Sequence, residues 1–218
     1  MNSRLRANAF RAQGRFQEAG AVFAEVATAQ EREQNYLDAA QNRNEAFKTF
    51  RQVSPLEAAE NLERAIKLKK EKQGNISQAA RYEQTLAELF EQELEDLAKA
   101  RATYKAAADD FDLENTKALA DRMWRKYAEL SALAEDYYAA TERFVFVAKR
   151  SLESNLMRWG VKEDLLKAGI CQLATGDMVG ARQKIEGYQE IDNSFAQQRE
   201  CALLMDLLEA IEKGDPDM

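Results

Sequence analysis

Residues 137–144 read Tyr-Tyr-Ala-Ala-Thr-Glu-Arg-Phe, with a large apolar residue at Tyr137, a small one at Ala140 and another large one at Phe144. Spacings of three and four residues place these side chains on one face of an α-helix. The alanine lets a second helix approach closely, and the aromatic groups fill the space beside it. The stretch therefore predicts a helix that packs against another helix.

The same pattern recurs along the chain every 40 or 41 residues, which is the length of two helices and two turns. An offset series lies between its members, most clearly at Leu37/Ala40 and Ile76/Ala79. This period predicts an all-α fold of stacked antiparallel helical hairpins, a TPR-like right-handed solenoid that runs into a partial C-terminal helical bundle. The members of the main series are Phe16/Ala19/Phe23, Leu56/Ala59/Leu62, Leu97/Ala100/Tyr104, Tyr137/Ala140/Phe144 and Met178/Ala181/Ile185.

We expect roughly ten helices, with hairpin repeats over residues 1–158 and the start of the bundle over residues 159–218. Turn signals fall between the repeats. Ser54-Pro55 predicts an N-cap followed by proline at the first helical position, Gly74-Asn75 the end of a helix, Gly176-Asp177 a break, and Asn193-Ser194 the start of the last helix. These breaks disfavour a coiled coil, which needs uninterrupted heptads.

Composition narrows the possible chemistry. The 218 residues include no histidine, which excludes histidine-dependent triads, HExxH zinc sites and Cys2His2 fingers. Two cysteines are too few for a disulfide framework or a cysteine-only zinc site. No apolar run approaches the about 20 residues of a membrane span, and residues 1–6 lack the apolar core of a signal peptide. We expect a cytoplasmic protein with no cofactor, no metal and, because no stretch is strongly basic, no nucleic-acid partner.

Two charged runs have competing interpretations. Asp109-Asp110-Phe111-Asp112 is comparable to aspartate-rich magnesium motifs, but no second acidic cluster is apparent on a facing helix, which favours a solvated helix end. Lys67, Lys69, Lys70 and Lys72 could meet phosphates or an acidic partner. The run precedes Gly74, and cations in a last helical turn complement the helix dipole without any partner.

A second basic group, formed by Arg122, Arg125 and Lys126, surrounds Trp124. Arg122 and Lys126 are four residues apart and share a helix face, so we expect tryptophan to point inward and the cations outward. Arg81 lies one hairpin period before Arg122, which makes a basic stripe plausible, although ordinary surface charge explains the same residues equally well. Arg158, Lys162 and Lys167 add basic density after the next helix, while Cys171, Cys201, Trp159 and the methionines are predicted to be core residues.

Residues 198–210, QRECALLMDLLEA, resemble the SRECxLMxxLLEA stretch of the soluble NSF attachment proteins of the α/β-SNAP type. Residues 54–66 are similar to the family's DPQEA and RAI motifs, residues 86–94 to IAEIYETEL, and residues 162–171 to KDYFFKAxLC. The resemblance covers nearly the whole chain and agrees with the repeat period.

The resemblance implies an adaptor, not an enzyme, that binds the assembled four-helix SNARE bundle, recruits the hexameric ATPase NSF for its disassembly, and associates peripherally with membranes. It also implies a basic SNARE-facing surface. In this chain Arg81 and Arg122 stand where the family has lysine, and Asn75 falls near a further basic position. The cationic positions implied for SNARE binding are Arg81, Arg122, Lys126, Arg158, Lys162, Lys167 and Arg199.

The family also has an N-terminal apolar loop that touches membranes and a C-terminal region that stimulates NSF. Neither is recognised in this chain, so we expect it to be truncated at both ends and to bind SNAREs without activating the ATPase. The alternative to the adaptor function is a generic TPR-like scaffold that binds an extended peptide in its groove. An enzyme is the least favoured interpretation, because no active site is recognisable.

Overall fold

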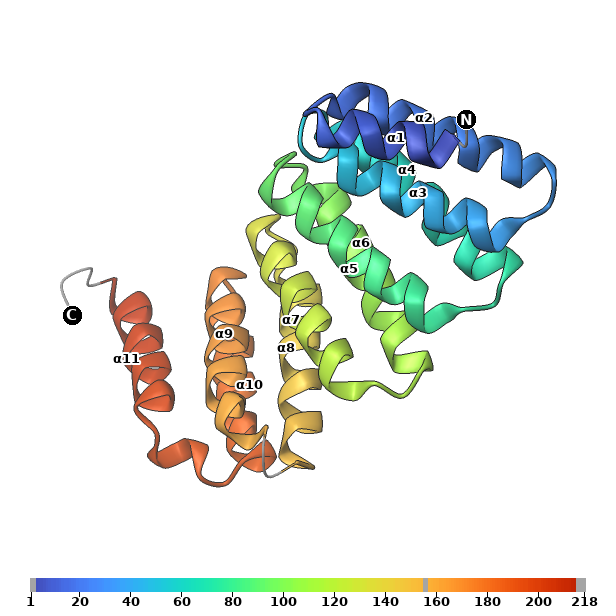
Figure 1. The fold of residues 1–218 in the computed structure, drawn as a ribbon. Coiled ribbons are helices and arrows are strands. Elements are labelled where there is room, and N and C mark those ends of the chain that lie inside the picture. Colours follow the sequence, from blue (N-terminus) through green and yellow to red (C-terminus); the bar gives the residue numbers. More distant parts are fainter. Residues whose placement is uncertain (1–2, 155–156, 215–218) are drawn as a thin grey trace. The chain divides into compact units, whose positions relative to one another are not determined.

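The computed structural model describes residues 3–154 and 157–214, which form eleven α-helices and no strand (Figure 1). The helices are α1 (Ser3–Ala12), α2 (Phe16–Arg32), α3 (Tyr36–Phe50), α4 (Pro55–Lys67), α5 (Ile76–Gln92), α6 (Leu97–Leu113), α7 (Lys117–Leu133), α8 (Tyr137–Leu152), α9 (Val161–Ala174), α10 (Met178–Ile191) and α11 (Arg199–Lys213). Three short elements accompany them: the π-helical turn η1 (Leu68–Lys72) and the 3-10 turns η2 (Arg158–Gly160) and η3 (Phe195–Gln197). The predicted all-α fold of stacked hairpins is confirmed.

The repeat pattern corresponds directly to the helices. Each member of the main series begins at the first or second residue of an even-numbered helix, from α2 to α10, and the offset series lies on α3 and α5. The repeat alanines are at most 2% exposed, as close helix packing requires. The opening residues are less buried than predicted, with Leu56 and Leu97 exposed, because they lie at the helix ends.

Five of the described turns, among them Gln34-Asn35, share one backbone device. A residue with positive φ is followed by an Asn or Asp whose side chain accepts a hydrogen bond from the first turn of the next helix. Gly74-Asn75 and Gly176-Asp177 use glycine for the left-handed position, whereas Glu95-Asp96 and Glu135-Asp136 use glutamate. Asn and Asp satisfy amides that the helix start leaves without partners.

Two of the predicted breaks differ in detail. Ser54 occupies the N-cap position before Pro55, but its side chain makes no capping hydrogen bond. Asn193-Ser194 leads into η3, and α11 begins later, after Gln198. The predictions at Gly74-Asn75 and Gly176-Asp177 are confirmed.

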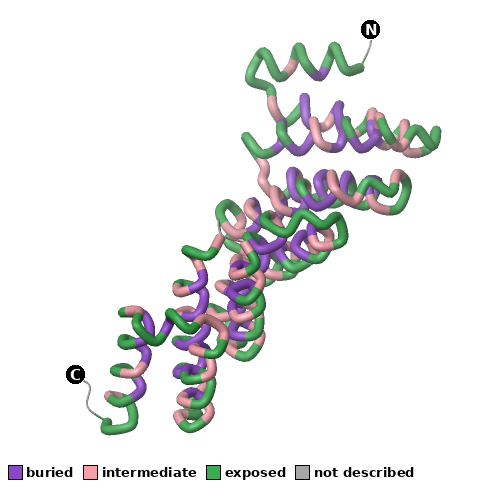
Figure 2. Tube along the Cα trace, turned by 90° about the horizontal axis from the view of Figure 1, so that it is seen from below, coloured by how far each residue is buried: buried purple, intermediate pink, exposed green. Residues whose placement is uncertain are grey.

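The chain divides into two compact units, residues 1–123 and 124–218, with the division inside α7. In the first unit, consecutive helices pack side by side. Figure 2 colours buried residues purple along the Cα trace. In this unit they include Phe23, Leu62, Leu89, Tyr104 and Phe111. The predicted boundary near residue 158, which separates repeats from bundle, stays a prediction.

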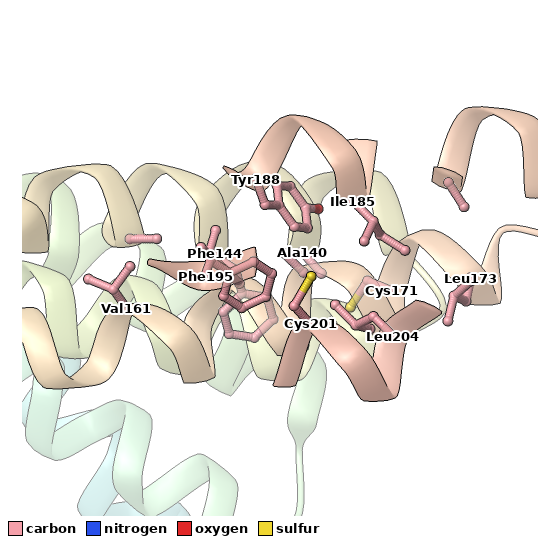
Figure 3. Packing of buried hydrophobic residues seen from close by; sticks show 14 of the residues in the cluster. Ala140, Phe144, Val161, Cys171, Leu173, Ile185, Tyr188, Phe195, Cys201 and Leu204 are labelled. Carbon is pink, nitrogen blue, oxygen red and sulfur yellow. The ribbon is translucent and has the colours of Figure 1, made fainter. Parts of the chain in front are cut away.

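In the second unit one apolar cluster joins α8, α9, α10 and α11 (Figure 3). Phe144, Leu165, Ile185 and Leu204 are at most 2% exposed within it. Both cysteine sulfurs lie inside this cluster, and burial raises the pKa of the Cys171 thiol. The prediction that Cys171 and Cys201 are core residues is confirmed.

Polar contacts connect alternate helices within each unit. In the first unit, Arg11 on α1 pairs with Glu45 on α3 at 3.0 Å. On the even-numbered side, Gln17 of α2 donates to Glu57 of α4 at 2.8 Å. In the second unit, α7 contacts α9 through Arg125 and Asp164 at 2.8 Å. Within each unit, these contacts therefore join neighbouring odd-numbered helices.

Candidate partner-binding surface

The seven predicted cations have one feature in common: the six that lie in α-helices are all on odd-numbered helices. Arg81 is on α5, Arg122 and Lys126 on α7, Lys162 and Lys167 on α9, and Arg199 opens α11. Arg158 belongs to η2, directly before α9.

In the first unit, Arg81 and Arg122 are exposed. Arg122 Nη2 lies 3.8 Å from Oε1 of Glu88, which is two helical turns after Arg81 on α5. This contact places the first turns of α7 beside α5, and the basic stripe through Arg81 and Arg122 stays a prediction. With the Arg122 side chain 62% exposed, the pair is a surface ion pair of small energetic value.

In the second unit, Lys167 lies between two carboxylates. Its ammonium is 2.9 Å from Glu129 on α7 and 3.0 Å from Glu163 on its own helix. Burial opposes its positive charge, but these two hydrogen-bonded carboxylates outweigh burial and raise the pKa of Lys167. Lys126, half-buried on α7, lies one turn before Glu129.

The remaining cations of the second unit gather near the start of α11. Lys162 pairs with Glu200 at 3.0 Å, and Arg199 Nε lies 3.5 Å from the same carboxylate. Arg158 is exposed, and the described residues give it no ion pair. Arg158 and Lys162 line a hollow of about 280 Å³ together with Trp159, Asp192, Ser194 and Gln198.

The prediction that Trp159 is a core residue is wrong. Its side chain is 85% exposed, whereas Trp124 is 3% exposed as predicted. Trp159 lies in the η2 turn, outside every repeat helix, so no facing helix covers it. The available signal was its position between Arg158 and Gly160, away from any apolar-alanine repeat.

The prediction that the cations around Trp124 point outward is wrong for Arg125. The prediction of outward cations holds for Arg122, but Arg125 is half-buried and forms a two-pronged pair with Asp164, with Nε to Oδ1 at 2.9 Å and Nη2 to Oδ2 at 2.8 Å. Asp164 is 2% exposed, and burial raises the pKa of its carboxyl despite the opposing effect of Arg125. Removing either partner of such a buried pair would leave the other charge without compensation and would destabilise the protein.

The lysine run and the aspartate run form a single structural cluster in the first unit. Lys70 Nζ lies 2.6 Å from Glu83 and 2.5 Å from Asp110. The predicted solvated helix end is therefore wrong for Asp110, which is largely buried in this contact. Lys69 is also buried, where it donates to Gln73 at 2.9 Å. Lys67 is the last residue of α4, and Lys69, Lys70 and Lys72 lie in the π-helical turn η1, the last helical turn before Gly74.

The described part of the chain contains no group of three or more potential metal ligands. None of the helices in this part combines the length and apolar character that crossing a bilayer requires.

Comparison with known proteins assigns the family. The family model for soluble NSF attachment proteins, SNAP, matches residues 5–218. The chain belongs to the SNAP family. Its relatives include a probable vesicular-fusion protein sec17 homolog of Neurospora crassa, 45% identical over 97% of this chain and 73% of the relative. The α-soluble NSF attachment protein of Homo sapiens is 32% identical over 97% of this chain and 71% of that protein.

The solved structure of BtubC (BKLC) from P. vanneervenii superposes with a TM-score of 0.52, over 88% of this chain and 79% of that one. At 17% identity this likeness shows the fold alone.

In this SNAP-family chain, most of the predicted cations already contact acidic groups, so the odd-numbered helices carry mixed charge. Exposed pairs of this kind exchange partners at little cost.

Proposed function

We propose that this protein is an adaptor in vesicle fusion and intracellular protein transport that binds assembled SNARE bundles and recruits an NSF-type ATPase. The observation that carries the proposal is the family match over residues 5–218, taken with the cations on the odd-numbered helices. The name of the family refers to attachment of NSF, and that of the Neurospora crassa relative to vesicular fusion.

The contact surface that we propose consists of the seven cations and Trp159. A helical bundle with an acidic surface attracts cations at several points, and no single contact needs to be strong. Trp159 adds a large apolar group beside Arg158 and Lys162, and tryptophan and arginine are enriched among residues that dominate binding energy. Peripheral membrane association follows through the membrane-bound SNAREs.

The first experiment compares binding to the assembled SNARE bundle with binding to each single SNARE, at low and high salt. We expect the protein to prefer the bundle and to lose affinity as salt screens the charges. Arg122→Glu with Lys126→Glu should abolish most of the binding. Arg101→Glu with Lys105→Glu, on α6, is the matched control because it has the same spacing and charge change.

Equal loss of binding in both double variants would mean that overall charge, rather than this surface, controls binding. Preference for one extended SNARE peptide over the bundle would instead favour the generic TPR-like scaffold. For NSF, co-sedimentation of the ATPase with the bundle should depend on this protein. If the ATPase does not sediment with the bundle when this protein is present, recruitment of NSF by this chain is contradicted.

A further inference from the structure

The η2 turn presents Arg158 and Trp159 but has little packing of its own. None of its three residues is buried, and the Trp159 side chain is 85% exposed. Backbone hydrogen bonds from Arg158 to Ser154 and from Gly160 to Met157 shape the turn locally. The turn continues directly into α9, where the Val161 amide donates to the Arg158 carbonyl, so contacts that hold the start of α9 also orient the turn.

One side chain supplies such contacts. The Arg125 guanidinium on α7 donates to Asp164 in the first turn of α9 and, through Nη2, to Ser151 Oγ near the end of α8 at 3.2 Å. A Cβ built on Gly160 would lie 3.6 Å from the same Nη2 atom. Arg125 therefore binds the helix on each side of η2, and it lines one hollow together with Gly160 of the turn.

We propose that Arg125 is a positioning residue that fixes the η2 turn, so that Arg158 and Trp159 are already oriented before a partner binds. This proposal rests on the proposed function, because it concerns the same contact surface. An interface side chain that is fixed in advance loses less conformational entropy on binding. Arg125 would act without touching the partner.

The chemistry of the contact requires arginine. A planar guanidinium reaches both Asp164 oxygens and Ser151 at the same time, whereas a lysine ammonium is a single point charge on a flexible stem. Arg125→Lys thus keeps a positive charge near the buried Asp164, but it removes the paired hydrogen bonds of the guanidinium to both carboxylate oxygens. Arg125→Met with Asp164→Leu removes the whole pair without leaving a buried charge unpaired.

Trp159 itself reports the result. In a Trp124→Phe background it is the only tryptophan, so time-resolved fluorescence anisotropy measures the motion of this side chain alone. We expect both Arg125 variants to increase the amplitude of the fast motion. Arg182→Lys, which alters a 2.7 Å pair between α10 and α11, is the control and should leave the anisotropy unchanged. Unchanged anisotropy in folded Arg125 variants would overturn the proposal.

Binding to the assembled SNARE bundle provides the second readout. We expect Arg125→Lys to raise Kd about fivefold. This is the effect expected when one large side chain, here that of Trp159, becomes ordered only on binding. In a protein that already carries Trp159→Ala and Arg158→Ala, Arg125→Lys should have no further effect. A full additional loss in that background would overturn the positioning role. Failure of the unmodified protein to bind would instead refute the proposed function, and the anisotropy would still decide the role of Arg125.

Discussion

At the scale of single residues, the carboxyl group of Glu83 has a pKa raised into the neutral range. It is 5% exposed on α5, and its carboxylate contacts Lys70 of η1. Burial raises the pKa of Glu83 to about 7; Lys70 opposes this effect, and the neighbouring Asp110 adds to it. One ammonium between two carboxylates leaves an excess negative charge, which favours a proton on the more buried acid.

This pKa predicts that stability decreases with pH. A carboxyl group whose pKa is raised on folding stabilises the protein below the pKa of the unfolded chain, 4.5, and loses that contribution as pH rises through about 7. Relative to Glu83→Gln, the free energy of unfolding of the unmodified protein should fall by on the order of 2 kcal/mol between pH 5 and 8. Urea unfolding across this range measures it. Glu60→Gln, at an exposed position, is the control. If the free energy of unfolding of Glu83→Gln changes with pH in parallel with that of the unmodified protein, the prediction is contradicted.

At the scale of helices, two glycines inside helices have opposite surroundings. A Cβ at Gly20 on α2 would lie 2.8 Å from the ring of Phe50, which is itself buried at the end of α3. At Gly187 on α10, a Cβ would meet no atom within 4 Å. The first glycine permits close helix packing, and the second only lowers helix propensity.

The same substitution should therefore have opposite effects at these two positions. Gly20→Ala should lower the free energy of unfolding by about 1–3 kcal/mol, because the packed Phe50 ring must move. Gly187→Ala should raise it by about 0.5–1 kcal/mol, since alanine loses less backbone entropy in a helix. Urea denaturation of both variants tests this, and stabilisation by Gly20→Ala would show that the α2–α3 contact relaxes freely.

At the scale of the whole molecule, the net charge is -7, although the proposed partner surface is basic. Acidic residues on the odd-numbered helices partly neutralise that surface. Glu129 and Glu163 both contact Lys167, at 2.9 and 3.0 Å. Charge near a binding surface mainly affects the rate of encounter, and salt screens this effect.

Removing these two acids should speed association with an acidic bundle. Glu129→Gln with Glu163→Gln is expected to raise the association rate roughly threefold at low salt and little at high salt. Glu142→Gln with Glu186→Gln, on the even-numbered α8 and α10, changes the net charge equally and is the control. Stopped-flow measurements give the association rate of each variant with the bundle. An equal increase of this rate in both double variants would mean that the position of the removed charge is unimportant.

The sequence alone was sufficient to predict the helical hairpins. Ala19, Ala100 and Ala140 recur with the period of a hairpin, and each is fully buried where two helices meet. This works because helical periodicity is local: residues three and four apart share a face whatever the rest of the chain does. The family resemblance also came from contiguous segments, and the family match confirms it.

The tertiary structure alone decided which charges contact each other and which aromatic group stays exposed. Arg125 meets Asp164 across 39 positions and Lys167 meets Glu129 across 38, distances at which helical periodicity carries no information about partners. Trp159 was assigned to the core because large apolar residues usually are buried, yet it lies in a turn that no helix covers. A pattern along one helix determines the face that becomes buried, but side-chain partners depend on how separate helices pack in space.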